Sequence, residues 1–387
     1  MRILLVCERM GARDDEGIRN LARSLAGRLS AGHTLLTITQ APADASVGVG
    51  GIGRAAARGG GSRPPHIPPG ALVRRTFVSR RLLAQCAEFR PDVTLYIPWT
   101  SGTLPTFFRG RVLRLATRAP LAIYLTQPYD NPRWQRGLIR YMLPDLVLAL
   151  SETVVRHVAQ MGAHAELAPP GVDLARFDLP DPSLRAALRA RLGLRPRDQM
   201  VLHVGHLNRQ RLDHAELGAL AARPGRRVMV VASTSTPQDA ALERALVRAG
   251  CTVLTEYVPH IETLYKAADA YLFPTREQRS SIGVPLSVLE ALACGVPVVS
   301  TRFEGLPRLF PGSPSLRFFG TSLQAERALD DLPRAPDPAA RALVRALDWS
   351  DVAERVEQHL ASLATVRDAT AARSEEPSPR GTRDESG

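Results

Sequence analysis

Short apolar segments alternate along this chain with longer amphipathic segments. In the first half, β-branched and apolar runs of five or six residues predict strands, and segments with apolar residues every three or four positions predict helices. The expected strands are 2–7, 34–39, 93–97, 121–125 and 146–150, and the expected helices are 17–29, 72–89, 103–117 and 152–161. Apolar strands that alternate with helices are typical of a parallel sheet covered on both faces.

A second alternating series follows after residue 180. A helix and turn are expected over 180–198, strands over 200–204, 227–232, 252–256, 270–273 and 316–319, and helices over 261–268, 321–331, 337–347 and 350–365. Residues 41–70 are rich in Gly, Pro and Ala and predict a flexible loop. The polar residues that end the chain have the composition of a disordered tail. The pattern therefore predicts two α/β domains.

The stretch IGVPLSVLEALACGVPVVS, residues 282–300, predicts a turn, a helix and a buried strand. Pro285 suits a first helical position, Gly295 suits a left-handed cap, and Val296–Val299 is apolar throughout. Glu290 is the only acidic or basic residue of the stretch and falls on the flank of the apolar helix face. Two interpretations are open: its carboxylate reaches water at the helix edge, or it lies in a cleft and accepts hydrogen bonds from a polar ligand.

This stretch resembles the nucleotide-sugar signature of family 4 retaining glycosyltransferases, in which two Glu residues precede a run that ends Cys-Gly-x-Pro-Val-Val. Glu290 matches the second Glu, which the resemblance assigns to the donor's ribose, and Leu286 lies beside it. The first Glu would fall at Ile282 and is missing, and Glu277 on the preceding polar loop is a candidate replacement. The resemblance implies the GT-B fold: two facing Rossmann-like domains with parallel sheets, and a C-terminal helix that crosses back to the first domain.

The same resemblance extends to Gly205-His-Leu-Asn-Arg-Gln-Arg211, which follows the first strand of the second series. The family has an Arg and a Lys that bind the donor diphosphate where this chain has His206 and Arg211. Both replacements can bind phosphate, and Arg does so through two hydrogen bonds; the alternative for Arg211 is a solvated arginine at a helix start. In the first half, Gly17 is the best match to a family glycine near the donor phosphates. The acidic residues before it, Asp14, Asp15 and Glu16, are also explained by helix capping.

We therefore expect Arg211 and Glu277 to act in catalysis, and the following residues to bind the donor: Gly17, Gly205, His206, Arg211, Leu286 and Glu290. No catalytic base is identified, because the departing diphosphate itself can deprotonate the acceptor in the mechanism that the resemblance implies. No Asp-x-Asp metal clamp ends a strand, so we expect an enzyme that needs neither metal nor cofactor. The alternative is a GT-B protein that binds donor or acts as a scaffold but is catalytically inactive, since the first Glu is absent.

The resemblance also divides the chain. Residues 1–170 are expected to form the acceptor domain, residues 171–347 the donor domain, residues 348–366 the crossover helix and residues 367–387 the tail. The Gly-Val-Asp at 171–173 and Phe177 resemble the family's interdomain segment. The predicted acceptor is a sugar, a lipid-linked glycan or a small molecule.

Charge is distributed unevenly over the two halves. The net charge is +12, and residues 1–170 contain 22 arginines against 11 acidic residues. Aromatic residues make up only 5% of the chain and no nucleic-acid-binding module is present, which argues against a nucleic-acid partner. No apolar run reaches the roughly 18 residues that a spanning helix needs. Four scattered cysteines predict buried free thiols in a reducing cytoplasm.

Several arginines of the first half lie beside bulky apolar residues. The clusters are Arg74, Arg75, Arg80 and Arg81 around Phe77, Arg109, Arg111 and Arg114 around Phe107 and Phe108, and Arg133, Arg136 and Arg140 around Trp134 and Tyr141. They form either a solvated surface or a surface that binds an anionic membrane from the cytoplasmic side.

Overall fold

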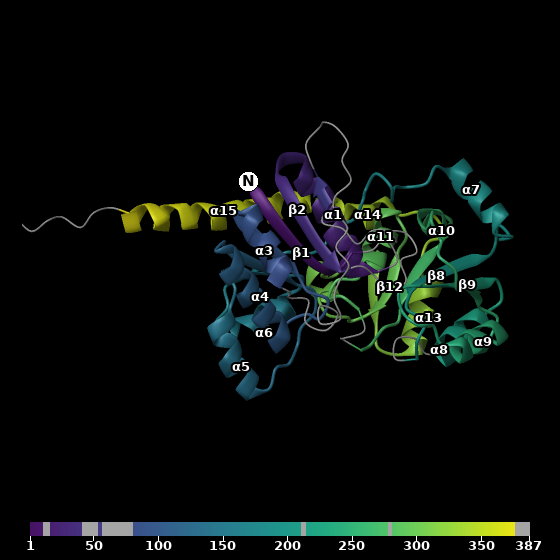
Figure 1. Cartoon of the computed structure of the whole chain (residues 1–387). Coiled ribbons are helices and arrows are strands. Elements are labelled where there is room, and N and C mark those ends of the chain that lie inside the picture. Colours follow the sequence, from purple (N-terminus) through teal and green to yellow (C-terminus); the bar gives the residue numbers. More distant parts are fainter. Residues whose placement is uncertain (11–15, 41–52, 56–79, 210–213, 278–280, 376–387) are drawn as a thin grey trace, which may run out of the picture.

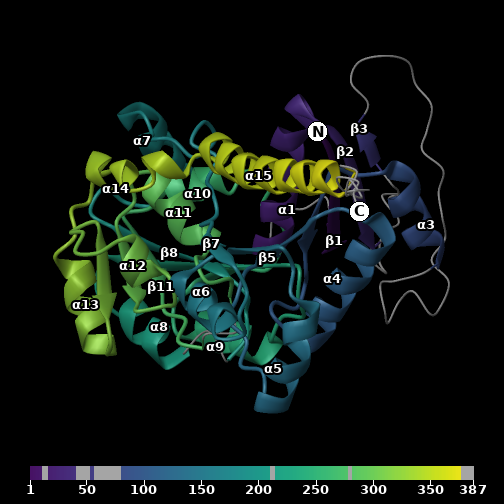
Figure 2. The same cartoon turned by 90° about the vertical axis from the view of Figure 1, so that its left-hand side faces the viewer.

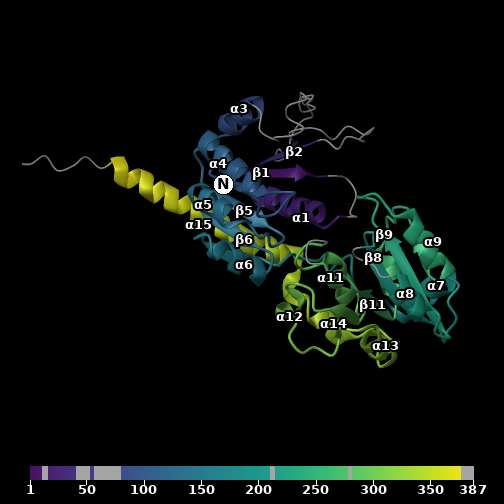
Figure 3. The same ribbon diagram turned by 90° about the horizontal axis from the view of Figure 1, so that it is seen from below.

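The computed structural model of this protein describes residues 1–10, 16–40, 53–55, 80–209, 214–277 and 281–375. It contains two sheets, one in each half of the chain, with helices on both faces of each (Figure 1). Seen from below, the two halves lie side by side, and the last helix runs from the second half along the first and extends beyond it (Figure 3).

The first sheet has the strand order β3-β2-β1-β4-β5-β6-β7. All neighbouring strands are parallel except β3, which pairs antiparallel to β2. The strands are β1 (Arg2–Arg9), β2 (Thr34–Gln40), β3 (Gly53–Ala55), β4 (Val93–Ile97), β5 (Leu121–Leu125), β6 (Leu146–Ala149) and β7 (Ala165–Leu167). The sequence predicted neither short edge strand, and β3 lies inside the segment that was expected to be a loop.

Strand β1 explains why a buried parallel strand appears in the sequence as one continuous apolar run. Its Ile3 and Leu5 face a core that the two halves share, whereas Leu4 and Val6 face a second core beneath α4 (Leu104–Thr117). Successive side chains of a strand point to opposite faces, so both alternating sets must be apolar when both faces are covered.

Helix α1 (Gly17–Gly32) follows β1, α3 (Arg80–Phe89) follows β3, and α4 follows β4. The remaining helical segments of the first half are α5 (Arg133–Ile139), η1 (Arg140–Met142) and α6 (Glu152–Ala159). The side chain of Thr103 accepts a hydrogen bond from the Thr106 amide at the start of α4, and Ser151 caps α6 in the same way. These caps satisfy backbone amides that have no partner inside the helix.

The second sheet has the strand order β10-β9-β8-β11-β12-β13, and all its strands are parallel. The strands are β8 (Gln199–Gly205), β9 (Arg226–Ala232), β10 (Thr252–Leu254), β11 (Ala270–Phe273), β12 (Val298–Thr301) and β13 (Leu316–Phe319). The helical segments are α7 (Pro182–Arg191), α8 (His214–Ala221), α9 (Ala240–Arg248), α10 (Glu262–Ala267), α11 (Leu286–Ala293), α12 (Leu306–Leu309), α13 (Ser322–Asp330), α14 (Pro338–Ala342) and η3 (Arg345–Leu347).

Helix α15 (Trp349–Glu375) crosses from the second half to the first, where it packs against α1 and β4 (Figure 2). This confirms the predicted crossing, although the helix continues beyond the expected end at residue 366. It starts beside the connection between the halves, because the Val172 amide donates to the Leu347 carbonyl (2.8 Å) and the Trp349 amide donates to the Val172 carbonyl (3.2 Å). A Cβ at Gly171 would lie 2.7 Å from the Trp349 ring, so glycine permits this close approach.

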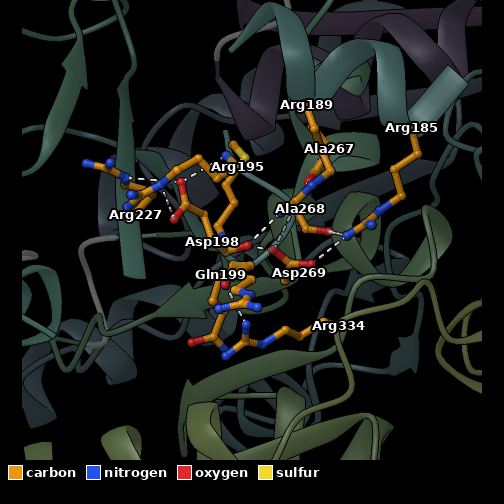
Figure 4. Close-up of polar contacts among 12 residues, drawn as sticks. Arg185, Arg189, Arg195, Asp198, Gln199, Arg227, Ala267, Ala268, Asp269 and Arg334 are labelled. Atoms are coloured by element: carbon orange, nitrogen blue, oxygen red, sulfur yellow. Dashed lines mark hydrogen bonds and ion pairs between the residues drawn. The ribbon is translucent and has the colours of Figure 1, made fainter. Parts of the chain in front are cut away.

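A buried charged network fixes α7 to the second sheet (Figure 4). Both oxygens of Asp269 accept hydrogen bonds, from Arg185 at 2.6 Å, from Arg189 at 2.7 Å and from the Met200 amide at 2.7 Å. Asp269 is only 2% exposed. A buried carboxylate is tolerated when it is paired and hydrogen-bonded, and this one fixes the helix that follows the connection between the two halves.

The four cysteines are buried and free, as predicted. Burial raises the pKa of the Cys86 thiol to about 12 and that of Cys251 to about 11. Thiols with such a high pKa are protonated at neutral pH and are poor nucleophiles, so these residues act as small core side chains.

Candidate functional site

A cleft of about 430 Å³ separates the carboxyl ends of the two sheets. Ligand sites of parallel α/β sheets form at these ends, where the loops between strands and helices begin. From the first half, the cleft is lined by Glu16, Gly17, Ile18, Asn20, Trp99, Thr100, Ser101, Thr103, Gln127, Pro128 and Tyr129. Most of its remaining lining comes from loops that follow β8, β9, β10 and β11 and from the start of α11.

Helix α11 places Glu290 at the wall of this cleft. Pro285 occupies the position just before the helix, one residue earlier than predicted, and Gly295 (φ 72°) adopts the left-handed conformation just beyond it. The half-buried carboxylate of Glu290 accepts a hydrogen bond from the Tyr265 hydroxyl at 2.9 Å. Burial raises the pKa of Glu290 to about 7, against the lowering effects of Tyr265 and of the positive charge of Arg176.

The residues around Glu290 hold Tyr265 in place. Tyr265 is fully buried, and its ring packs edge-on against Phe177 at 5.8 Å and tilted against Tyr271 at 5.8 Å. Burial and the Glu290 charge keep the pKa of Tyr265 well above 10, so its hydroxyl stays a donor at neutral pH. The sequence pattern left open whether Glu290 reaches water or lies in a cleft, and this geometry favours the cleft.

The loop after β8 places Gly205 and His206 in the same cleft. Nδ1 of His206 lies 2.6 Å from Oγ1 of Thr236, which is on the loop after β9 and also lines the cleft. Arg211, the second residue predicted to bind the diphosphate, lies outside the described residues. The loop after β9 carries a run of hydroxyl residues, Ser233 to Thr236, that the sequence analysis missed. Its signal was a hydroxyl-rich segment directly after a strand.

Gly17 and Ile282 meet across the cleft. A Cβ at Gly17 would lie 2.9 Å from Cδ1 of Ile282, whose side chain is 5% exposed. The position that has a Glu in the resembled family therefore holds an apolar side chain packed on the facing half. Two hydrogen bonds flank this contact: the Gly283 amide donates to the Thr126 carbonyl (2.8 Å), and Nε2 of Gln127 donates to the Ser281 carbonyl (2.5 Å).

The other predicted donor-side residues lie in different surroundings. Leu286 is buried and lines the cleft. Glu277 is exposed on the loop after β11 and is not among the residues that line the cleft. Glu16 caps α1 by accepting from the Arg19 amide at 2.9 Å, as its capping interpretation predicted, whereas Asp14 and Asp15 lie outside the described residues.

The acceptor side of the cleft contains side chains that the sequence analysis did not single out. They are Asn20, Trp99, Thr103 and Tyr129, all half-buried. No single motif marks them, because they come from helix α1, the loop after β4 and the loop after β5, which only the fold brings together. His157 lies outside the cleft lining, and its Nε2 is 2.9 Å from the Asp130 carboxylate.

Only part of the arginine clusters of the first half lies at the surface. Phe107 is fully buried in the core, and Arg109 pairs with the buried Glu8 at 2.5 Å. Arg114 pairs with Asp145 at 2.6 Å. Phe107 is therefore not at the surface, and the charges of Arg109 and Arg114 are neutralised by acids. The cluster around Phe77 lies largely outside the described residues.

The second half of the chain matches a known protein family. Residues 198–318 match the sequence profile of the family described as "Glycosyl transferases group 1". The D-inositol 3-phosphate glycosyltransferase of Segniliparus rotundus is 34% identical over 178 residues, which are 42% of this chain and 38% of that protein. The protein of the same name from Mycobacterium avium is 34% identical over 194 residues, 48% of this chain and 44% of that protein. The matches thus span less than half of each curated relative.

Solved structures match almost the whole chain. Anabaena Alr3699/HepE in complex with UDP-glucose has a TM-score of 0.68 at 16% identity and covers 94% of this chain and 100% of that one. Sucrose-phosphate synthase from Thermosynechococcus elongatus has a TM-score of 0.70 at 18% identity and covers 96% and 99%. The predicted α/β fold of two facing domains, the GT-B fold, is thereby confirmed.

Proposed function

We propose that this protein is a glycosyltransferase that moves a sugar from a nucleotide-diphosphate donor to a hydroxyl group of an acceptor, with retention of configuration. One observation carries the proposal: Gly17, Gly205, His206, Leu286 and Glu290, expected from the sequence to bind the donor, all line one cleft between two facing domains. The family profile that matches the second half, and the UDP-glucose bound by a protein of the same fold, support it.

In this proposal the donor lies along the second half of the cleft. Glu290 accepts hydrogen bonds from the ribose hydroxyls, and the nucleobase packs near Tyr257 and Ile261, which also line the cleft. His206 and Arg211 bind the diphosphate, with Gly17 permitting its close approach from the first half. Both side chains can donate hydrogen bonds to diphosphate oxygens. Arg211 can donate two at once, so we expect it to bind the diphosphate more strongly than His206 does.

The chemistry requires little from the protein except position and charge. The bond between the anomeric carbon and the diphosphate oxygen breaks, a bond to the acceptor oxygen forms on the same face, and the acceptor proton passes to the departing diphosphate. Arg211 and His206 stabilise the charge that grows on the leaving group, and we expect this stabilisation to be the protein's main contribution to catalysis. Glu277, the expected replacement for the missing Glu, is exposed and outside the cleft lining, so we assign it no role at the donor sugar. We propose no metal or cofactor.

The acceptor lies in the first half, over Trp99, Tyr129 and Asn20. A sugar, a lipid-linked glycan or a small polyol would use both the aromatic surfaces and the polar groups of this wall. We place the reaction in the cytoplasm, where nucleotide sugars and reduced thiols coexist.

Thermal denaturation with UDP, ADP, GDP and their glucose derivatives tests donor binding. A bound donor at 100 times its Kd should add about 2.7 kcal/mol to the free energy of unfolding. Release of nucleoside diphosphate in the presence of candidate acceptors then tests transfer. Ile282 favours one alternative, a GT-B protein that binds donor without turning it over. Binding with no release under any acceptor would support that alternative, and no binding to any nucleotide would contradict both.

A further inference from the structure

Two adjoining helical segments of the first half expose large apolar side chains. Helix α4 exposes Phe108 (57%) and Leu115 (62%), and α5 with η1 exposes Trp134 (65%), Leu138 (49%) and Tyr141 (83%). The spacing within each segment, seven residues from first to last, keeps its members on one side of a helix. Both α5 and η1 pack against α4 at the outer edge of the first half (Figure 1). Neighbouring exposed apolar residues of this size mark an interaction surface.

The charges beside these side chains have one sign. Residues 104–118 and 131–144 contain seven arginines and no Asp, Glu or Lys. Acids elsewhere neutralise two of the arginines, Arg109 and Arg114. Of the other five, Arg136 donates to the Asn131 carbonyl at 2.8 Å. Within the described part of the chain, no ion pair engages the remaining four, Arg111, Arg118, Arg133 and Arg140, which are exposed or half-exposed. We call these four arginines and the five apolar residues above the aromatic–arginine face.

We propose that the aromatic–arginine face docks the protein on the surface of an anionic lipid bilayer. Trp and Tyr side chains are favoured at the depth of lipid headgroups, and apolar side chains enter the boundary with the acyl chains. Arginines beside them bind lipid phosphates through paired hydrogen bonds. A folded protein partner would need to supply a matching acidic surface, whereas an anionic leaflet presents negative charge over the whole area of the face. In the described residues no helix is long and apolar enough to cross a membrane, so the contact would be peripheral.

The aromatic–arginine face lies near the acceptor side of the cleft. Helix α4 begins directly after Ser101 and Thr103, and α5 begins a few residues after Gln127 and Tyr129. All four residues line the acceptor side of the cleft. A bilayer held by these helices would therefore lie near the half of the cleft to which we assign the acceptor. Docking itself does not depend on the proposed activity, since it is measured without donor or acceptor.

Sedimentation of the full chain with vesicles tests the proposal. We expect binding to vesicles that contain phosphatidylglycerol and little binding to vesicles of phosphatidylcholine alone. Binding should fall steeply between 0.1 M and 1 M salt, because the Debye length falls from about 10 Å to about 3 Å. Equal binding to both vesicles, or binding to neither, would overturn the proposal.

Matched variants locate the contact. Changing Arg111, Arg133 and Arg140 together to Gln should weaken binding roughly a hundredfold, since each basic residue contributes about fivefold. The control changes three exposed arginines of the second half, Arg191, Arg244 and Arg248, to Gln and alters the net charge equally. An equal loss in the control would mean that net charge, not this face, binds the lipid, and would overturn the proposal.

A second pair of variants tests the apolar part. Phe108→Ser, Trp134→Ser and Tyr141→Ser together should also reduce binding at least tenfold, whereas Leu184→Ser, Val247→Ser and Leu323→Ser, at exposed apolar positions of the second half, should not. Melting temperatures confirm that each variant is folded. Sedimentation velocity without lipid measures whether the face instead binds a second copy of the chain. A wild-type dimer that the aromatic variant abolishes, together with unchanged vesicle binding, would overturn the proposal and assign the face to a second copy of the chain.

Discussion

The hydroxyl of Tyr265 donates a hydrogen bond of 2.9 Å to Oε2 of Glu290 at the wall of the cleft. This contact supplies one of the several hydrogen bonds that a buried carboxylate can accept and leaves the remaining acceptor positions for a ligand. Because the pKa of Glu290 is raised to about 7 by burial, a substantial fraction of the empty protein carries a neutral carboxyl at neutral pH.

Donor binding should therefore depend on pH. Ribose hydroxyls donate to the ionised carboxylate more strongly than to the neutral acid, so affinity should be highest above pH 7 and should decline toward pH 5. A calorimetric titration with the donor at pH 5.5, 7 and 8.5 measures this. The Glu290→Gln variant, which cannot ionise, is the control, and an equal decline in that variant would assign the pH dependence to another group.

The same raised pKa predicts an effect of Glu290→Gln on stability. A Glu whose pKa is raised on folding stabilises the folded state below its unfolded pKa of about 4.5, and this contribution is lost as pH rises through about 7. Replacement by Gln removes the cost of the buried charge, so the variant should be more stable than the wild type at pH 8 by about 1–3 kcal/mol, with a smaller difference at pH 4.5. Urea denaturation at the two pH values measures it.

Donor affinity should change in the opposite direction in this variant, because Gln accepts weaker hydrogen bonds than a carboxylate. Greater stability with weaker donor binding is expected of a residue retained for function at a cost in stability. Unchanged donor affinity would show that Glu290 is not the ribose ligand.

The Asp269 network predicts that Asp269→Asn, which replaces one carboxylate oxygen by an amide nitrogen, strongly destabilises the protein. Asp269→Asn leaves the buried guanidinium groups of Arg185 and Arg189 without their shared carboxylate, which should cost about 3–5 kcal/mol. Glu354→Gln, at an exposed position of α15, removes an acid of the second half and should change stability little. Denaturant midpoints compare the two variants. A loss below about 1 kcal/mol for Asp269→Asn would mean that the arginines find other partners.

The sequence predicted the repeating strands and helices because burial on both faces leaves a continuous apolar run, as in β1 and β12. The helix that carries Glu290 could also be predicted, but the pattern left open whether its carboxylate reaches water or lies in a cleft, and only the fold favours the cleft. The short strands β3 and β7 could not be predicted, because three residues carry too little pattern. The pairing of Arg109 with Glu8 is likewise invisible in sequence, since the two residues are 101 positions apart and only the fold joins them.

The contact between Gly17 and Ile282 predicts that Gly17→Ala lowers stability in the wild type but raises it when Ile282 is shortened. Gly17→Ala adds a Cβ that would lie 2.9 Å from Cδ1 of Ile282, and the buried Ile must shift to admit it. We expect a loss of about 1 kcal/mol. In the Ile282→Val background that methyl group is gone, so Gly17→Ala should instead stabilise helix α1 by roughly 0.5 kcal/mol. Denaturation of the four proteins gives the coupling energy. Additive effects would show that the two halves do not meet here in solution.

The contribution of Arg211 to donor binding can be separated from its contribution to the chemical step. Charge grows on the diphosphate as the sugar departs, so a cation that contacts it should stabilise the transition state more than the bound donor. Arg211→Ala should therefore lower kcat by at least tenfold at saturating donor, with a smaller rise in the Kd of the donor. Arg209→Ala is the matched control two residues away, because Arg209 pairs with Asp239 at 3.2 Å and should affect neither quantity. Steady-state release of nucleoside diphosphate and calorimetry measure the two effects separately. Full turnover in Arg211→Ala would remove Arg211 from the site and leave His206 as the side chain expected beside the diphosphate.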